Sequence, residues 1–168
     1  MQTQSLNLPD GLSIRPSRDS DRPFMESLFK STQDDLRMID AEDDFIETLI
    51  DQQHHAQTVG YGEQFPNAMY FIIEKIGEPM GRIVIDFGPN EIRVVDVAFV
   101  PRARNKGYGT SVLRALKSAA GSARAPLMLS VNRENHAARS LYQREGFRIE
   151  QRFGMNDLMA WYPTLQHM

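Results

Sequence analysis

The hydrophobic positions along this chain fall into strand-like and helix-like stretches. Short runs rich in β-branched and aromatic residues, bounded by glycine, proline or asparagine, predict strands, and apolar residues spaced three and four apart predict helices. The first pattern predicts strands at residues 12–15, 69–75, 82–87, 93–100, 127–131, 147–153 and 158–162. The second predicts helices at residues 21–38, 42–58, 107–120 and 135–145. Turns are expected at Gly77-Glu78-Pro79 and at Pro89-Asn90.

The length and composition limit the domain organisation. A chain of 168 residues with 41% hydrophobic content suits one domain with a single core, expected over residues 12–163, with a flexible tail at residues 1–11. The segment from Met1 to Asp10 lacks the apolar core of a signal peptide, and no apolar run approaches the roughly 20 residues that span a membrane. A cytoplasmic protein without a membrane partner is therefore expected.

The overall charge and the absence of cysteine exclude several classes of function. A net charge of -3 argues against a polycationic surface that holds nucleic acid. With zero cysteines there is no disulfide, no thiolate zinc site and no cysteine nucleophile. The adjacent His54 and His55 lack the i, i+4 spacing of a helical metal pair, so no metal is expected.

Charge is unevenly distributed along the chain. The segment from residue 34 to 51 carries only Arg37 against a set of acids: Asp34, Asp35, Asp40, Glu42, Asp43, Asp44, Glu47 and Asp51. The segment from residue 102 to 152 is rich in arginine and lysine. The basic segment suits a polyanionic cofactor and the acids suit a cationic acceptor, although either set could simply be the solvated face of a helix.

The strongest candidate site lies between a predicted strand and a predicted helix. Residues 100–110 contain an Arg-x-x-Gly-x-Gly turn from Arg104 to Gly109. Glycines at 107 and 109 permit positive φ and close backbone approach, and the first amides of a helix have no partners within it, so an anion can accept from them. The turn is a candidate pyrophosphate site, although two glycines also make an ordinary tight turn. The helix after it places five apolar residues on one face: Val112, Leu113, Leu116, Ala119 and Ala120.

Two common phosphate motifs do not match this turn. A P-loop has Lys-Ser/Thr directly after its last glycine, whereas here Thr110-Ser111 follows Gly109 and Lys106 precedes Gly107. A Rossmann fingerprint has a third glycine three residues past the second, where this chain has Val112. The turn alone therefore does not identify a cofactor.

A second cluster follows the next predicted strand, with the pattern Asn135-x-x-Ala138-x-x-Leu141-Tyr142-x-x-x-Gly146-Phe147. Asn135 is a good N-cap for a short helix, and Gly146 is a natural terminator. Ala138, Leu141 and Tyr142 fall on one helix face. From this pattern alone, Tyr142 could be an ordinary core tyrosine.

Taken together, the two clusters resemble the GNAT superfamily of acyl-CoA-dependent N-acetyltransferases. They stand in the family's order and separation, and the resemblance extends loosely over about residues 12–162. It implies an α/β (α+β) fold with a mixed, mostly antiparallel central sheet flanked by helices. It also implies that the central strands splay apart to leave a cleft shaped for CoA.

The resemblance further implies acetyl-CoA as the co-substrate. Asn135 would hydrogen-bond the pantetheine arm, and the Tyr142 hydroxyl would protonate the departing CoA thiolate. Main-chain groups near Ala98 to Val100 would pair with the pantetheine amides and polarise the thioester carbonyl. The expected cofactor-binding residues are Ala98, Phe99, Val100, Arg104, Asn105, Lys106, Gly107, Tyr108, Gly109, Thr110, Asn135 and Ala138.

The acceptor amine must lose a proton, because an amine of pKa about 10 is almost wholly protonated at pH 7. Family members often carry Glu eleven positions before Arg104, where this chain has Arg93. Asp96 is the nearest substitute, since polyamine-acetylating relatives also carry an acid there and an Asp in a Val-rich strand needs a partner or a task. It could equally face solvent or pair with an arginine such as Arg93. The reserve candidates are Asp86, Glu91, His54 and His55.

The sequence therefore predicts acetyl transfer from acetyl-CoA to a primary amine by direct attack, with Asp96 or water taking the proton and Tyr142 acting as the acid. The acceptor could be a polyamine, an amino acid, an aminoglycoside-like drug, or a protein N-terminus or lysine, and the assembly could be a homodimer. The competing prediction is a non-catalytic acyl-CoA-binding or interaction domain. Arg93 favours that alternative, whereas Tyr142 and Asp96 argue against it.

Overall fold

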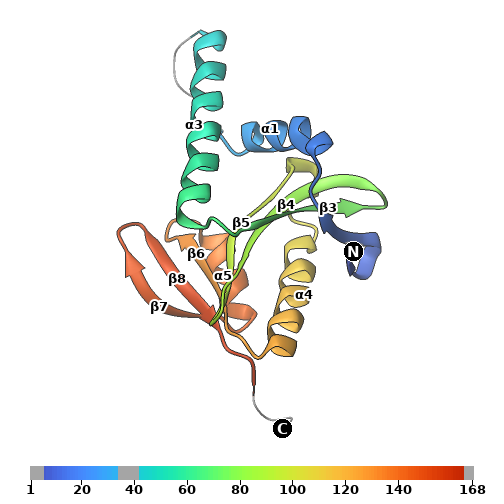
Figure 1. Ribbon diagram of the computed structural model, residues 1–168, viewed down its shortest axis with the longest axis vertical. Coiled ribbons are helices and arrows are strands. Elements are labelled where there is room, and N and C mark those ends of the chain that lie inside the picture. The colour runs from blue at the N-terminus through green and yellow to red at the C-terminus, as the bar shows by residue number, and fades with distance from the viewer. Residues whose placement is uncertain (1–5, 34–41, 165–168) are drawn as a thin grey trace.

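One eight-stranded sheet organises the protein, in a computed structural model that describes residues 6–33 and 42–164 (Figure 1). The strands lie in the order β1-β2-β3-β4-β5-β6-β8-β7, and every neighbouring pair is antiparallel except β5 and β6. Their bounds are β1 Leu6–Asn7, β2 Leu12–Pro16, β3 Met69–Lys75, β4 Glu78–Phe87, β5 Ile92–Phe99, β6 Leu127–Asn132, β7 Arg148–Phe153 and β8 Asn156–Trp161. The predicted mixed, mostly antiparallel sheet is confirmed.

Helices cover both faces of this sheet. The bounds are α1 Arg22–Ser31, α3 Asp43–Gln64, α4 Tyr108–Ala123 and α5 His136–Arg144. Leu141 and Tyr142 of α5 pack on the cluster that contains the buried side chains of α4, so these two helices share one face. Helices α1 and α3 lie together above the sheet in Figure 1, and α3 extends well beyond its edge.

The main core lies between the sheet and α4. Four α4 side chains are buried there, Val112, Leu113, Leu116 and Ala120, and they pack against isoleucines, leucines and valines of the central strands. Ala119, predicted on the same face, is instead exposed, because it lies off the stripe that these four residues define. Two smaller clusters, Leu28 with Met80, Val100 and Ala103, and Phe29 with Ile46 and Ile50, hold α1 and α3 in place.

A β-bulge in β5 and an early end to one strand pairing shape the centre of the sheet. Ile85 pairs with Val94 and Val84 pairs with Asp96, which leaves Val95 as the extra residue. The parallel pairing of β5 with β6 ends at Val94, opposite Leu129. The rest of β5 therefore diverges from β6 and opens a gap between them.

Several predicted boundaries differ from the observed ones. The turn expected at Gly77-Glu78-Pro79 is formed by Ile76 and Gly77, with φ of 49° and 79°. Two positive φ values are typical of the two-residue turns that connect antiparallel strands, and β4 therefore begins at Glu78. Pro79 is accommodated there beside a register shift between Ile73 and Glu74.

The first two helices and the N-terminal segment also differ. The helix predicted over 21–38 ends at Ser31, and residues 34–38 of that prediction lie outside the described residues. Helix α3 continues to Gln64, past the predicted end at 58. Leu6 and Asn7, predicted as part of a flexible tail, pair with β2 as an edge strand, and residues 1–5 lie outside the described residues.

Candidate active site

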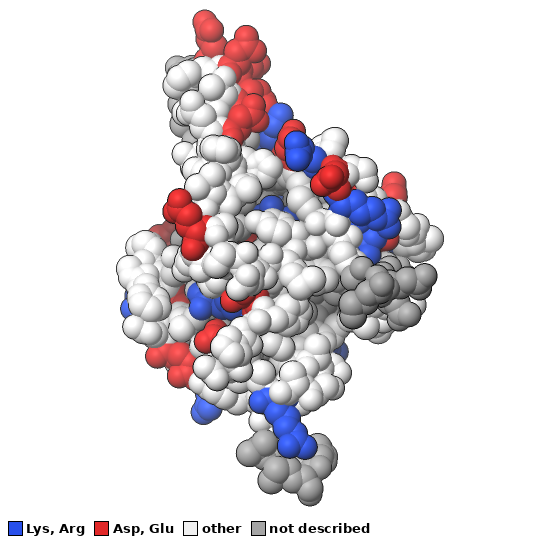
Figure 2. All heavy atoms as spheres, in the orientation of Figure 1, with Lys and Arg blue, Asp and Glu red and all other residues white. Residues whose placement is uncertain are grey.

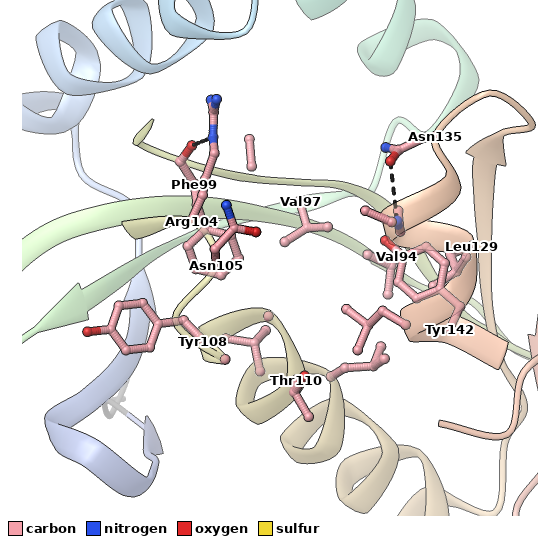
Figure 3. A pocket seen from close by; sticks show the side chains of 18 of the residues that line it. Val94, Val97, Phe99, Arg104, Asn105, Tyr108, Thr110, Leu129, Asn135 and Tyr142 are labelled. Carbon is pink, nitrogen blue, oxygen red and sulfur yellow. Dashed lines mark hydrogen bonds between the residues drawn. The ribbon is translucent and has the colours of Figure 1, made fainter. Parts of the chain in front are cut away.

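A cleft of about 620 Å³ opens where β5 leaves β6, with α4 and α5 as its walls (Figure 3). Because the bulge at Val95 puts Val94 and Val97 on the same face of β5, both contribute to the floor. The remainder of the floor is also apolar, formed by Val112, Leu113, Leu116 and Leu129. Such a surface suits the alkyl part of a long, flexible ligand.

The glycine turn closes one end of this cleft. Gly107 is the N-cap of α4 with a φ of 82°, and no side chain caps the helix there. Asn105 also has positive φ, at 60°. The first amides of α4 are consequently open to an anion, which is the arrangement that binds phosphate. Gly109 lines the cleft inside the first turn of α4, but its φ is not positive.

At the end of β5, the main-chain N–H and C=O groups of alternate residues point either to β4 or to the cleft. The Val100 N–H donates to the Met80 carbonyl at 2.8 Å, so Val100 is engaged with β4. Successive residues of a strand direct their main-chain groups to opposite sides, so those of Phe99 and Val97 point toward the cleft. The Arg104 Nε donates to the Phe99 carbonyl at 3.1 Å and braces the turn against the strand. Of the expected residues 98–100, Phe99 is therefore the one that offers main-chain groups to a ligand.

Helix α5 presents Asn135 and Tyr142 to the cleft. The Asn135 Oδ1 accepts from the Ala138 N–H at 3.2 Å and caps the helix, as predicted. The Tyr142 ring lies beside Val94 and Leu129 in Figure 3 and packs on Phe147, with ring centroids 5.8 Å apart. Burial, and secondarily the charge of Asp96, raises the pKa of Tyr142. Within the described part of the chain its hydroxyl has no hydrogen-bond partner, so this proton is free to meet a ligand.

Ionic contacts fix the position of α5, which has no buried residue of its own. At its C-terminal end, the Glu145 carboxylate accepts from Arg114 at 3.0 and 3.2 Å, and the Glu145 carbonyl accepts from the Lys117 Nζ at 2.7 Å. Near its first turn, the Arg139 Nη2 lies 3.2 Å from the fully buried Asp157 of β8. These contacts hold α5 to α4 and to the sheet, and so help to set the width of the cleft.

Asp96 faces the opposite side of the sheet and is ion-paired with Arg82. The partner proposed from sequence, Arg93, instead donates to the Ser130 Oγ at 2.8 Å. The bulge and the pairing of β4 with β5 place Asp96 diagonally across from Arg82, which the local sequence does not reveal. Above this pair lies Tyr61 of α3, where burial and then the charge of Asp96 raise the pKa of the phenol to about 12.

Arg82 also lines a second cavity of about 640 Å³, called here the α1–α3 groove. The groove is lined by Ser17, Arg18, Asp19, Arg22, Met25, Glu26, Asp51, His54, His55, Thr58, Tyr70 and Arg82. His54 stacks on Phe29 with ring centroids 4.7 Å apart, and burial, then Arg82, lowers its pKa. The imidazole is therefore neutral at pH 7.

The structure brings most of the predicted cofactor residues together. The expected residues that line the cleft are Ala98, Phe99, Arg104, Asn105, Gly107, Tyr108, Gly109, Thr110, Asn135, Ala138 and Tyr142. Val100, Lys106 and Asp96 do not line it. Sequence reasoning missed the apolar floor, whose residues resemble ordinary core positions. It also missed Arg82, whose only sequence signal is a charge between Gly81 and the apolar run Ile83-Val84-Ile85.

The described acids of the predicted acidic segment mostly line neither cavity. Asp34, Asp35 and Asp40 lie outside the described residues. Figure 2 shows acidic side chains gathered at the free end of α3, where Asp43 and Asp44 occupy the first turn. Glu47 pairs with Lys30 at 3.0 Å, and Asp51 alone of these acids lines the groove. Of the reserve bases, His54 and His55 line the groove, while Asp86 and Glu91 line neither cavity.

Two further features are absent from residues 6–33 and 42–164. No helix in these ranges is both long and apolar enough to cross a membrane. Nor do three or more His, Asp or Glu side chains there gather in a way that could hold a metal ion.

Comparison with protein families connects this geometry to known proteins. The family model described as "Acetyltransferase (GNAT) family" matches residues 25–147, a range that includes both walls of the cleft. Curated protein sequences give no match to the chain.

Solved structures share the fold at low sequence identity. The PaiA N-acetyltransferase from Thermoplasma acidophilum, in complex with coenzyme A, is 17% identical with a TM-score of 0.67, covering 90% of this chain and 98% of that one. The ribosomal-protein-S18-alanine N-acetyltransferase from Escherichia coli is 15% identical with a TM-score of 0.65, covering 94% and 98%. A GNAT family acetyltransferase from Elizabethkingia anophelis with acetyl-CoA bound is 15% identical with a TM-score of 0.61, covering 91% and 99%.

Proposed function

The chain belongs to the GNAT acetyltransferase family, and from that premise we propose that it transfers an acetyl group from acetyl-CoA to a primary amine. The observation that carries this proposal is the cleft itself. The N-terminus of α4, which has no side-chain cap, lies at one end of it, and the Tyr142 hydroxyl, which has no partner among the described residues, lies on the opposite wall. One end suits a pyrophosphate, and the other suits a departing thiolate.

The residues present fit coenzyme A in size and chemistry. The amides that follow Gly107 would hold the pyrophosphate, and the exposed Arg104 and Lys106 add positive charge beside them. The apolar floor would cover the pantetheine arm, whose amides would meet main-chain groups of Phe99, whose carbonyl also accepts from the Arg104 Nε, and the side chain of Asn135. Bound in this way, acetyl-CoA supplies an activated thioester at the centre of the sheet.

The proposed reaction needs one acid and one proton acceptor. As the amine nitrogen bonds to the thioester carbon and the carbon–sulfur bond breaks, Tyr142 donates its proton to the sulfur. The raised pKa of Tyr142 keeps the phenol protonated at neutral pH, so it is in the correct state to act as an acid. The proton released by the amine goes to Asp96, directly or through water. Asp96 then loses this proton to solvent and the Tyr142 phenolate takes one from solvent, which restores both groups.

Asp96 is suited to this second role by its position. It lies on β5, whose Val94 and Val97 form part of the floor of the cleft, and its charge is the second cause, after burial, of the raised pKa of Tyr142. Its side chain is 23% exposed, so the carboxylate is not sealed off by Arg82. It can therefore orient an ammonium group and accept its proton.

We expect Asp96→Asn to lower kcat/KM, most strongly at low pH. Free amine is scarce there, so the loss of the proton acceptor has its largest effect, and activity should recover in part as pH rises toward the amine pKa of about 10. The measurement is a pH profile of kcat/KM. Asp86→Asn is the matched control, because Asp86 lies on the neighbouring strand β4 and, unlike Asp96, forms no ion pair with a described residue. Identical profiles for wild type and Asp96→Asn would remove Asp96 from the mechanism.

The ion pair of Asp96 with Arg82 also favours a second candidate, a non-catalytic domain that binds acyl-CoA. The two functions are separated by incubating the protein with acetyl-CoA and a panel of amines while free thiol is measured. Thiol release that requires both the amine and the protein supports acetyl transfer. Binding of acetyl-CoA without release for any amine would support the non-catalytic domain.

A further inference from the structure

The charged groups around Arg82, which lines the α1–α3 groove and contacts Asp96, point to a class of acceptor. We propose that the α1–α3 groove binds a free α-amino acid, with its carboxylate on the arginines of the groove and its amine at Asp96. This inference rests on the proposed acetyl transfer and names the acceptor for it.

Arg82 is the central group of this site. Its side chain is only 6% exposed, and its Nη2 donates to Asp96 and, at 3.1 Å, to the Gln57 Oε1. Among the described residues its buried Nε has no hydrogen-bond partner. A guanidinium can donate five hydrogen bonds, so this one retains unused capacity where it lines the groove. A carboxylate is the acceptor that fits it best.

The adjacency of Arg82 and Asp96 matches the adjacency of charges in an α-amino acid. The ammonium and carboxylate of such a molecule are attached to the same carbon, and the protein presents a carboxylate and a guanidinium in direct contact. A ligand bound with opposite polarity would satisfy both at once. It would also place its amine beside Asp96, which contacts Arg82 but does not itself line either cavity.

Two more arginines provide positive charge at the groove. Arg18 and Arg22 are exposed, line the groove, and form no side-chain ion pair within the described part of the chain. They lie just before and at the start of α1, where Figure 2 shows basic and acidic side chains alternating. A carboxylate that approaches Arg82 is therefore attracted at long range as well.

The other charged and titratable groups of the groove would lie near the side chain of a bound amino acid, and the groove as a whole suits an amino acid better than a polyamine. They are Asp19, Glu26, Asp51, His54, His55 and Tyr70. A polyamine would find these acids but would have to lie against Arg18, Arg22 and Arg82. A zwitterion meets attractive partners for both of its charges.

Matched triples of amines test this proposal. Each triple contains an L-amino acid, its carboxamide and its decarboxylated amine, all assayed with saturating acetyl-CoA by thiol release. Loss of a charge-assisted contact typically reduces binding by roughly tenfold to a hundredfold, so the free acid should exceed both analogues in kcat/KM by that factor. A wild type that prefers the amides or the decarboxylated amines would overturn the proposal and would favour a peptide N-terminus or a polyamine, respectively.

Two variants locate the carboxylate. Arg82→Met should bring the ratio of kcat/KM for the free acid to kcat/KM for the amide close to one. Both substrates place their amine at Asp96, so any disturbance of Asp96 by the substitution affects both values and leaves their ratio unchanged. The double variant Arg18→Gln/Arg22→Gln should lower this ratio by roughly threefold or more. It leaves the ion pair of Arg82 with Asp96 intact, so it provides a test even if Arg82→Met fails to fold. The control Arg124→Gln/Arg148→Gln removes two exposed arginines that line neither cavity and should keep the wild-type ratio.

The possible results separate this inference from the proposed function. An unchanged ratio in every folded groove variant would show that the carboxylate is held elsewhere and would overturn the inference while acetyl transfer stands. If acetyl-CoA binds but none of the amines causes thiol release, the proposed function itself would be overturned.

Discussion

Tyr142→Phe should lower kcat by roughly 10²- to 10⁴-fold, the usual contribution of a general acid. The substitution removes one hydroxyl and keeps the ring, which packs on Phe147 and on the core shared with α4. Acetyl-CoA affinity should therefore change little, because the pyrophosphate turn lies at the other end of the cleft. The measurement is kcat with a productive amine, together with acetyl-CoA binding by calorimetry.

The pH dependence gives a second test of this role. Because burial and Asp96 raise the pKa of Tyr142, the phenol remains protonated up to and beyond its ordinary pKa of about 10. Wild-type kcat should consequently not fall through deprotonation of Tyr142 between neutral and mildly alkaline pH. Tyr162→Phe, which alters an exposed phenol outside both cavities, should match the wild type. Equal kcat for Tyr142→Phe and Tyr162→Phe would return Tyr142 to a packing role.

Gly107→Val should abolish detectable binding of acetyl-CoA while leaving the protein folded. With a φ of 82°, Gly107 is in the left-handed region, which a β-branched residue occupies only with strain of about 1–3 kcal/mol. Among residues 6–33 and 42–164, no group beyond the chain neighbours of Gly107 lies within 4 Å of the position where a Cβ would be, so the effect comes from backbone conformation and not from collision. Relief of the strain rotates the turn and redirects the amides that would hold the pyrophosphate.

Gly77→Val is the matched control for this substitution. Gly77 has a φ of 79° and equally open surroundings, but it lies in the turn between β3 and β4. Both variants should lose a similar amount of stability, and Gly77→Val should keep the response to acetyl-CoA. If Gly107→Val also keeps that response, the pyrophosphate is held elsewhere.

Local sequence signals were sufficient for the parts of the site that depend on a few neighbouring residues. The bounds of β3 follow from a run of apolar residues ended by a turn, and the role of Asn135 as an N-cap follows from its place before a short amphipathic helix. The positive φ of Gly107 similarly follows from the residue type. Each of these features depends only on residues close to it in the sequence.

The parts that could not be predicted depend on contacts between distant segments. The bulge at Val95 changes which side chains of β5 share a face, and only the pairing with β4 reveals it. The same pairing brings Asp96 to Arg82, 14 positions away in the sequence, instead of to Arg93. The apolar floor of the cleft exists because β5 and β6 separate, so its valines and leucines cannot be told from core residues before the sheet is assembled.

Thermal unfolding of the wild-type protein with and without millimolar acetyl-CoA tests the central claim most directly. A ligand present at about 100 times its dissociation constant stabilises the folded state by about 2.7 kcal/mol, so the cleft between α4 and α5 predicts a clear rise in the unfolding midpoint. The rise should grow with the logarithm of the acetyl-CoA concentration. An unfolding midpoint that does not move at millimolar acetyl-CoA would contradict the proposed site and the acetyl transfer that depends on it.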